Sequence, residues 1–298
     1  MKRLKISVSF LFLFLSLSVV SHSAFSALSY NRVKSHSFLK DSVVKILAIG
    51  NSFSDDAIEH YLYGLAKEGG HTVIIANLYI GGAPLELHVK NIRANKSVYS
   101  YRKIAKDGTK TITPKISIET ALADEDWDYI SLQQASSFSG MLETVQKDLP
   151  ELYQYVKARA KNPDVKYIYH QTWAYAQSST HKGFANYNNN QDNMYKGIVN
   201  VSKNVKKIVP VDIIIPAGTA IQNARTSFVG DSLTRDGYHL NVLGRYTASC
   251  TWYTAIFKDK VIGKKYAPEK LSENEIAVAQ QAASYAVKKP FIVKGLKK

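Results

Sequence analysis

The sequence predicts a three-layer α/β fold: a parallel sheet of five strands with helices on both faces and an inserted β-hairpin. The prediction rests on short, nearly continuous apolar runs rich in β-branched residues, and on stretches of helical spacing that separate them. A strand buried on both faces loses the apolar-polar alternation of a half-exposed strand, so runs of this kind are typical of parallel sheets.

Five apolar runs mark the strands. The first is VVKILAI at 43–49, which ends at Gly50, and a helix is expected after it because Ile58, Leu62 and Leu65 recur at helical spacing. The remaining strands are expected at 71–80, 128–132, 165–170 and 211–215. Further helices are expected at 117–124, 143–160, 187–206, 241–257 and 272–287.

One segment interrupts this alternation. Residues 97–118 hold two arms of strand-forming residues around Lys106-Asp107-Gly108, the pattern of a β-hairpin inserted after the second strand. Pro114 lacks a backbone N–H, which predicts that the second arm lies at a sheet edge. Insertions at the carboxyl ends of parallel strands border the crevice where such folds bind ligands, so we expect the hairpin beside the functional site.

The N-terminus has the pattern of a cleavable signal peptide, which we assign to residues 1–26. Lys2, Arg3 and Lys5 precede an apolar run that is short for a membrane span and is followed by small residues. Residues 27–298 have the length of one domain and contain no linker rich in proline, glycine or serine. Cys250 is the lone cysteine, so no disulfide is expected within the chain. We expect a secreted protein, periplasmic or extracellular, without a membrane anchor.

The chain is basic, with a formal net charge of +15 at pH 7. Such a charge favours acidic partners, for example uronate-containing glycans or anionic envelope polymers, although a lysine-rich surface also serves solubility alone. The lysines are scattered and no basic motif interleaved with aromatic residues stands out, so nucleic acid is not expected as a partner. The sequence carries no signal for an oligomeric state.

The first string that bears on chemistry is GNSFSDD at 50–56, where the first strand ends and the first helix begins. A serine in the first turn of a helix, at the carboxyl end of a central strand, faces the crevice, and nearby backbone N–H groups are free to bind an oxyanion. Ser52 is therefore a candidate nucleophile. Ser52 followed three residues later by Asp55 is also the pattern of a capping box, which needs no catalysis.

The second string is DGYHLN at 236–241, on a loop between the last strand and a helix. Asp236 and His239 are three residues apart, so the carboxylate can stabilise the imidazole while the imidazole accepts a proton from a serine. The alternative is that Asp236 caps a turn and His239 is a surface or core residue. The presence of both strings favours a triad of Ser52, His239 and Asp236.

Both strings resemble the SGNH hydrolases, also called GDSL-type esterases and lipases, which carry a Gly-x-Ser block after the first strand and an Asp-x-x-His block near the C-terminus. GNSFSDDA has Asn51 where that family usually has aspartate, whereas DGYHLN follows the pattern without departure. Together with IGGAPLELH, SLQQASSFSG, HQTWAY and PAGTAIQNAR, these strings are similar to a branch found mainly in Bacteroidetes and described as a domain of unknown function. The resemblance covers nearly all of residues 27–298 and implies the flavodoxin-like SGNH fold.

The resemblance also implies an oxyanion hole with three donors. The Ser52 amide is the first, and the second is a glycine after the second strand, for which Gly82 is our choice and Gly81 the alternative. The third block of the family reads Gly-x-Asn-Asp, but Gln133 and Gln134 stand in its place. A glutamine carboxamide donates as asparagine does, so Gln134, or alternatively Gln133, is expected to substitute; the other interpretation is that both only bond neighbouring loops.

Four further side chains are candidates for binding substrate. Asn51 neighbours the nucleophile, and His170, Trp173 and Tyr175 follow the fourth strand, where aromatic rings either stack on a sugar or pack the loop. The literal GDSL string at 230–233 is not the expected nucleophile, because Ser232 follows no apolar strand and opens no helix.

No metal or cofactor is expected, since the histidines lack ligand spacing and one cysteine is present. The resemblance implies a secreted serine esterase or acyl hydrolase acting on a small ester or an acylated glycan, with acetyl groups on polysaccharide as one substrate class. The alternative is a non-catalytic glycan-binding or cell-envelope protein on the same scaffold, which the altered third block motivates. A lipase is not favoured, because the sequence shows no apolar lid and no amphipathic anchor.

Overall fold

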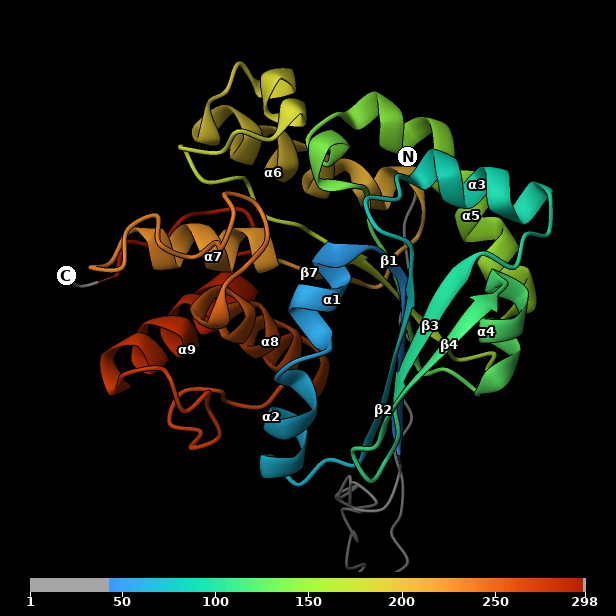
Figure 1. The fold of residues 1–298 in the computed structure, drawn as a ribbon, viewed down its shortest axis with the longest axis horizontal. Helices are drawn as coiled ribbons and strands as arrows, with labels where there is room; N and C mark the ends of the chain where they lie inside the picture. The colour runs from blue at the N-terminus through green and yellow to red at the C-terminus, as the bar shows by residue number, and fades with distance from the viewer. Residues whose placement is uncertain (1–42, 297–298) are drawn as a thin grey trace, which may run out of the picture. The chain divides into compact units, whose positions relative to one another are not determined.

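The central sheet of residues 43–296, the part of the chain that the computed structural model describes, contains seven strands in the order β4-β3-β2-β1-β5-β6-β7 (Figure 1). Five of them run parallel: β1 (Val44–Gly50), β2 (Val73–Tyr79), β5 (Tyr129–Leu132), β6 (Lys166–His170) and β7 (Ile213–Ile215). Their order, β2-β1-β5-β6-β7, is that of the flavodoxin-like fold. The predicted fold class is confirmed.

The sheet has two strands more than the five predicted, because the hairpin joins it. β3 (Tyr99–Ile104) pairs antiparallel with β2, and β4 (Lys110–Ile116) pairs antiparallel with β3. Pairing with β3 satisfies the backbone groups along the outer side of β2, which an isolated insertion would leave exposed. β4, which contains Pro114, lies at the sheet edge as predicted.

Apolar side chains leave the sheet on both faces. On β1, Ile46 and Ala48 belong to one core and Leu47 and Ile49 to the other, because successive side chains of a strand alternate. One face is covered by α1 (Ser52–Ile58), α2 (Leu62–Glu68), α7 (Ala217–Arg225), α8 (Val242–Phe257) and α9 (Glu273–Lys288) (Figure 1). The other is covered by α3 (Leu85–Arg93), α4 (Ile118–Asp124), α5 (Leu142–Arg159) and the C-terminal half of α6 (Gln191–Ile208).

Helix α8 is the central helix of its layer. It is apolar on nearly every side, with Cys250, Trp252 and Tyr253 fully buried, as expected of a helix surrounded by other elements. Its Ser249 hydroxyl donates to the carbonyl of Ala57 on α1 at 2.7 Å. The helix that begins at Ser52 is therefore held against a rigid neighbour.

Several helices differ from the predictions. Helices α3 and α7 were not predicted, and the first helix is broken into α1 and α2 around residues 59–61. Ahead of α6, Asn188 and Asn189 adopt left-handed conformations after a 3-10 turn, η2 (Lys182–Tyr187), so this helix begins at Gln191 rather than at 187. The predicted signal peptide, residues 1–26, lies outside the described residues. Within residues 43–296, no helix has both the length and the apolar character needed to cross a bilayer.

Candidate active site

Ser52 is the first residue of α1 and follows the carboxyl end of β1, where the sequence places it. Asn51 caps this helix: its Oδ1 accepts the N–H of Phe53 at 3.0 Å, and its own N–H donates to Ser54 Oγ at 3.1 Å. The capping box is thus formed by Asn51 and Ser54 rather than by Ser52 and Asp55. The hydroxyl of Ser52 is not used in capping.

Ser52, His239 and Asp236 lie in one hydrogen-bonded row. Ser52 Oγ is 2.9 Å from His239 Nε2, and His239 Nδ1 is 2.7 Å from Asp236 Oδ2. The second carboxylate oxygen of Asp236 accepts the backbone N–H groups of Tyr238 at 3.1 Å and of His239 at 2.7 Å. The structure therefore brings together the three residues of the predicted triad in the order of a nucleophile, a base and an orienting carboxylate.

The electrostatics of Asp236 suit an orienting role. Partial burial raises the pKa of its carboxyl, but the hydrogen bonds from the His239 ring and from two backbone N–H groups outweigh burial, so the net pKa lies below its ordinary value. An ionised Asp236 accepts a hydrogen bond from His239 Nδ1–H, which keeps the proton of the neutral ring on Nδ1. The lone pair on Nε2 then faces Ser52.

A second carboxylate, Asp56, ties the nucleophile helix to the triad loop. Its side chain is 0% exposed, and its Oδ1 accepts Arg235 Nη1 at 2.9 Å and Arg245 Nε at 2.7 Å. Its Oδ2 accepts the backbone N–H of Leu240 at 2.8 Å. Arg235 and Leu240 flank Asp236 and His239, so Asp56 fixes the loop one helical turn beyond Ser52. Asp56 lies within the nucleophile string, but no pattern in the sequence indicates this role, because its partners are about 180 residues away.

The backbone N–H groups that are expected to bind an oxyanion are free. Among residues 43–296, the amides of Ser52, Gly81 and Gly82 donate no hydrogen bond. Gly82 has φ +65° in the turn that follows β2, and this turn is joined to the nucleophile segment because Asn51 Nδ2 donates to the Ala83 carbonyl at 3.0 Å. Gly81 precedes Gly82 in the same turn, and a Cβ placed on it would lie 3.4 Å from the Tyr79 hydroxyl.

The two glutamines of the third block make other contacts. Gln134 accepts the N–H groups of Leu85 and Ala135 at 2.9 and 2.8 Å and donates to Thr144 Oγ1 at 3.0 Å. The structure thus does not join Gln134 to the triad, because its carboxamide links helices α3 and α5.

Gln133 lies closer to the nucleophile, because it contacts Asn51, the residue that precedes Ser52. Its Nε2 donates to Asn51 Oδ1 at 2.9 Å, and its Oε1 is 2.8 Å from His170 Nδ1. Its carboxamide carbon would meet a Cβ placed on Gly50 at 3.1 Å, so it packs onto the strand end that carries the nucleophile. Gln133 supports Asn51 by these contacts, and Asn51 is itself 2% exposed and hydrogen-bonded within the protein.

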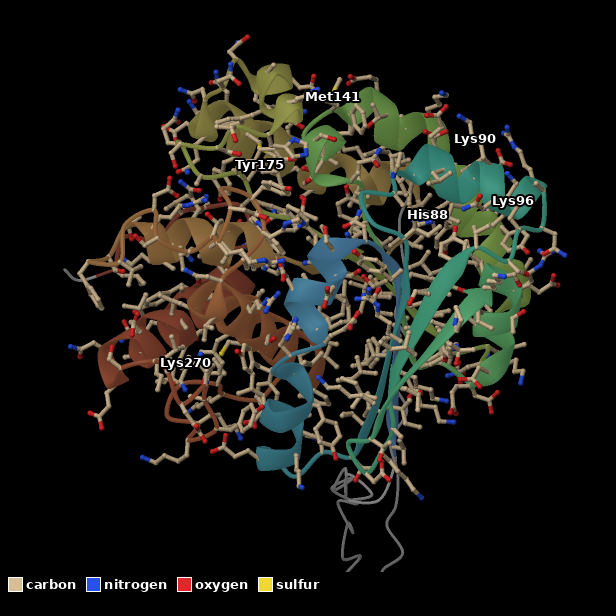
Figure 2. The ribbon with its side chains drawn as sticks, in the orientation of Figure 1. His88, Lys90, Lys96, Met141, Tyr175 and Lys270 are labelled. Atoms are coloured by element: carbon tan, nitrogen blue, oxygen red, sulfur yellow. The ribbon has the colours of Figure 1, made fainter. Side chains whose placement is uncertain are left out.

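The predicted sugar-stacking residues His170, Trp173 and Tyr175 are buried, which leaves them no free face for a ligand (Figure 2 labels Tyr175). Trp173 stacks on Phe53 at 4.2 Å and donates to the Tyr238 carbonyl at 2.8 Å. The Tyr175 hydroxyl bonds Ser136 Oγ at 2.8 Å. Burial lowers the pKa of His170 to about 3, so this ring is neutral. These side chains form the layer beneath the site.

The aromatic groups beside the triad are Tyr238 and His181, both half-buried. The Tyr238 ring lies 4.2 Å from the His239 ring, and the His181 ring lies 4.7 Å from the Tyr238 ring in an edge-to-face arrangement. Tyr238 is part of the DGYH string and was detectable there. His181 lies in a polar segment without a motif, so sequence analysis missed it.

The literal GDSL string has a structural role. Asp231 accepts the backbone N–H of Gln177 at 2.7 Å, Gln191 Nε2 at 3.0 Å and Arg225 Nε at 2.7 Å. Leu233 is fully buried, and Ser232 is exposed within the loop. The string therefore holds the segment after β6 against the triad loop.

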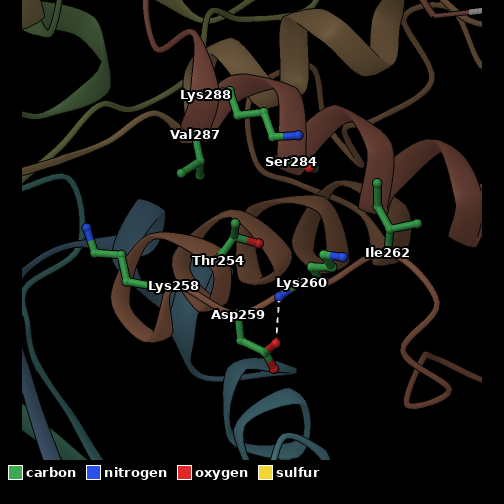
Figure 3. Close-up of a pocket in the computed structure, with 8 residues that line it drawn as sticks. All are labelled: Thr254, Lys258, Asp259, Lys260, Ile262, Ser284, Val287 and Lys288. Carbon is green, nitrogen blue, oxygen red and sulfur yellow. Dashed lines mark hydrogen bonds between the residues drawn. The ribbon is translucent and has the colours of Figure 1, made fainter. Parts of the chain in front are cut away.

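Two other features of the described residues lie apart from the triad. No group of three or more histidine, cysteine, aspartate or glutamate side chains within residues 43–296 is placed to hold a metal ion. A cavity of about 650 Å³ opens where α8 and α9 end (Figure 3). Lysines, the apolar Ile262 and Val287, and the polar Thr254, Asp259 and Ser284 line it, and no triad residue does.

Comparison with known proteins places the chain in a family. Residues 45–286 match the family model described as "Domain of unknown function (DUF4886)". The crystal structure of a DUF4886 family protein from Bacteroides uniformis is 50% identical, with a TM-score of 0.84 over 86% of this chain and 98% of that one. An acetylxylan esterase from Geobacillus stearothermophilus is 13% identical, with a TM-score of 0.47 over 76% of this chain and 97% of that one, a likeness too low to transfer an activity. No curated protein matches.

Proposed function

Because the chain belongs to DUF4886, a family whose domain has no known function, we propose its activity from the site itself: a serine hydrolase that cleaves carboxylic esters. The observation that carries the proposal is the row of hydrogen bonds from Ser52 Oγ to His239 Nε2 and from His239 Nδ1 to Asp236 Oδ2, at 2.9 and 2.7 Å. A surface serine, a turn-capping aspartate and a packing histidine have no need to align in this way.

In the proposed reaction, His239 Nε2 removes the proton of Ser52 as Oγ attacks the ester carbonyl carbon. The carbonyl oxygen becomes negative and is bound by the N–H groups of Ser52 and Gly82. His239 then gives its proton to the leaving alcohol, which leaves an acyl group on Ser52. A water molecule repeats the sequence, releases the acid and restores the serine, while Asp236 stabilises the imidazolium in both steps.

For the substrate we propose an acyl group, such as acetyl, on a glycan outside the cytoplasm. The signal-peptide pattern of residues 1–26 supports the location, and the resemblance of the sequence blocks to esterases supports the reaction class. The net charge of +15 suits an acidic glycan.

Two measurements test the activity. A fluorophosphonate probe, which reacts with an activated serine, is expected to label Ser52, as shown by mapping the modified peptide. Hydrolysis of p-nitrophenyl acetate is expected to fall by about 10⁴-fold or more in Ser52→Ala, because a triad serine supplies most of the rate. Ser232→Ala, on the GDSL string, is the matched control and keeps the wild-type rate. Equal rates for wild type and Ser52→Ala, with no labelling, would favour the glycan-binding alternative.

A further inference from the structure

We propose that His181 and Tyr238 form the surface that receives the alcohol part of the ester, with His181 Nε2–H donating a hydrogen bond to a hydroxyl of a sugar-like leaving group. This inference rests on the proposed ester hydrolysis at Ser52. It adds a residue that lies 58 positions from the triad histidine in sequence and a preference for hydroxylated alcohols.

The rings of Tyr238 and His181 lie next to the triad histidine. The Tyr238 ring is 4.2 Å from the ring of His239, and the His181 ring is 4.7 Å from Tyr238. Both are half-buried, so each keeps an exposed part. The fully buried ring of Tyr175 lies against both, 4.9 Å from His181 and 5.7 Å from Tyr238, and it packs in turn on the buried ring of Phe184. A sugar ring can stack on an aromatic ring that is packed on one side and exposed on the other.

The position of these two rings relative to His239 determines which part of the ester they can contact. In ester cleavage the alcohol oxygen receives its proton from His239 Nε2, whereas the carbonyl oxygen lies toward the donors at Ser52 and Gly82. Tyr238 is covalently next to His239, and His181 packs on Tyr238. These two side chains therefore border the residue that gives its proton to the departing alcohol.

His181 has a hydrogen-bond donor, Nε2–H, that is free to bind a ligand. Its Nδ1 accepts the backbone N–H of Gly183 at 3.0 Å, so the proton of the neutral ring is on Nε2. Within residues 43–296, Nε2 has no hydrogen-bond partner. Burial and the nearby His239 together lower the pKa of His181, although Asp236 opposes them, and a lowered pKa maintains the neutral donor at neutral pH.

The segment that leads to His181 is hydrogen-bonded to the triad loop and its neighbours. Ala176 donates its N–H to the Gly237 carbonyl at 2.8 Å, inside the triad loop. Asp231 and Asn189 bind Gln177 on the other side, at 2.7 and 2.9 Å. Because these contacts already order the segment before His181, its side chain loses little conformational entropy when a ligand binds.

The experiment compares leaving groups in the full-length protein. Wild type and His181→Phe are assayed with p-nitrophenyl acetate and with a mono-O-acetylated methyl glycoside, and Ser52 labelling by the fluorophosphonate is timed. Phenylalanine keeps the ring against Tyr238 but removes the donor. We expect kcat/KM for the sugar ester to fall about tenfold, the value of one hydrogen bond, while labelling and p-nitrophenyl acetate hydrolysis stay within twofold. His181→Gln, which keeps an N–H donor, is expected to restore part of the sugar-ester rate.

His71→Phe is the matched control, because His71 is also half-buried and stacks on Phe257 at 4.2 Å, outside the triad loop. It is expected to leave both esters unchanged. If His181→Phe does not fold, as judged by circular dichroism, His181→Ala replaces it. Equal loss on both esters, or no loss on either, overturns this inference alone. A wild-type protein that is neither labelled nor active on either ester overturns the proposed function and this inference with it.

Discussion

The buried carboxylate of Asp56 accepts the backbone N–H of Leu240 at 2.8 Å, which joins the helix of the nucleophile to the loop of its base. Ser52 and His239 are 187 residues apart in sequence, so their 2.9 Å separation depends on such a contact. Arg235 and Arg245 neutralise the carboxylate and complete its hydrogen bonds. The alignment of the triad thus depends on Asp56 as well as on Ser52, His239 and Asp236.

Asp56→Asn is therefore expected to reduce both stability and reactivity. The substitution keeps the shape of the side chain but leaves two arginines without their charge partner, which costs on the order of 3 kcal/mol in the free energy of unfolding. Displacement of His239 by a fraction of an ångström lowers the rate of Ser52 labelling roughly 10- to 100-fold. Urea unfolding and fluorophosphonate labelling measure the two effects. Asp55→Asn, on the same helix at a partly exposed ion pair, is the control and changes stability by less than about 1 kcal/mol.

Gln133→Ala and Gln134→Ala are expected to differ in kind. Gln133→Ala removes a donor to Asn51 Oδ1, so it loosens the residue that caps the nucleophile helix and slows Ser52 labelling. Gln134→Ala removes the one oxygen that accepts the N–H groups of Leu85 and Ala135, which costs about 1–3 kcal/mol of stability with little change in labelling. If Gln134→Ala slows labelling more than Gln133→Ala, the oxyanion assignment to Gln134 holds after all.

Stability is expected to fall as the pH is lowered from about 6.5, because of His170. Burial depresses its folded pKa to about 3, whereas the unfolded chain takes up a proton near 6.5. The contribution of the neutral ring is complete above pH 6.5 and is lost between pH 6.5 and 3, at roughly 1.4 kcal/mol per pH unit once the unfolded histidine is protonated. Urea unfolding between pH 7 and pH 4 measures this slope, and His170→Gln lowers it by about that amount.

His88 provides an independent check on the same effect. It is fully buried, its Nδ1 lies 2.8 Å from the Tyr99 hydroxyl, and burial lowers its pKa to about 4 (Figure 2). His88→Gln is thus expected to reduce the slope as His170→Gln does, although His88 lies on the other layer. Unchanged slopes in both variants would show that the two rings are protonated in the folded protein.

The sequence predicted what depends on local patterns. The strands buried on both faces, the place of Ser52 after β1, and the pairing of Asp236 with His239 all follow from periodicity and from residues a few positions apart. Long-range contacts were not predictable. Gln133 and Gln134 are adjacent, and only the packing of α3 and α5 decides which neighbours each one meets. His170, Trp173 and Tyr175 lie on the predicted edge of the sheet, but rings from distant segments cover them. Trp252 packs on His170, Phe53 on Trp173 and Tyr238 on Tyr175.

Gly237 lies between Asp236 and Tyr238 and offers the sharpest test of how the triad loop is held. Its φ is +89°, and a Cβ placed there would lie 2.9 Å from Ser179 Cα, which is backbone and cannot move aside cheaply. Gly263 has nearly the same φ, +90°, but a Cβ there meets nothing within 4 Å. Both alanine variants therefore carry the left-handed penalty of about 1–2 kcal/mol in stability.

The two variants differ only in what the new methyl group displaces. In Gly237→Ala it pushes the triad loop away from the segment that carries His181, so we expect Ser52 labelling to slow at least about tenfold. In Gly263→Ala labelling remains at the wild-type rate, although the variant carries the same left-handed penalty in stability. Labelling rates that fall equally in both variants would mean that reactivity follows global stability, and that the docking of Ser179 against Gly237 does not position His239.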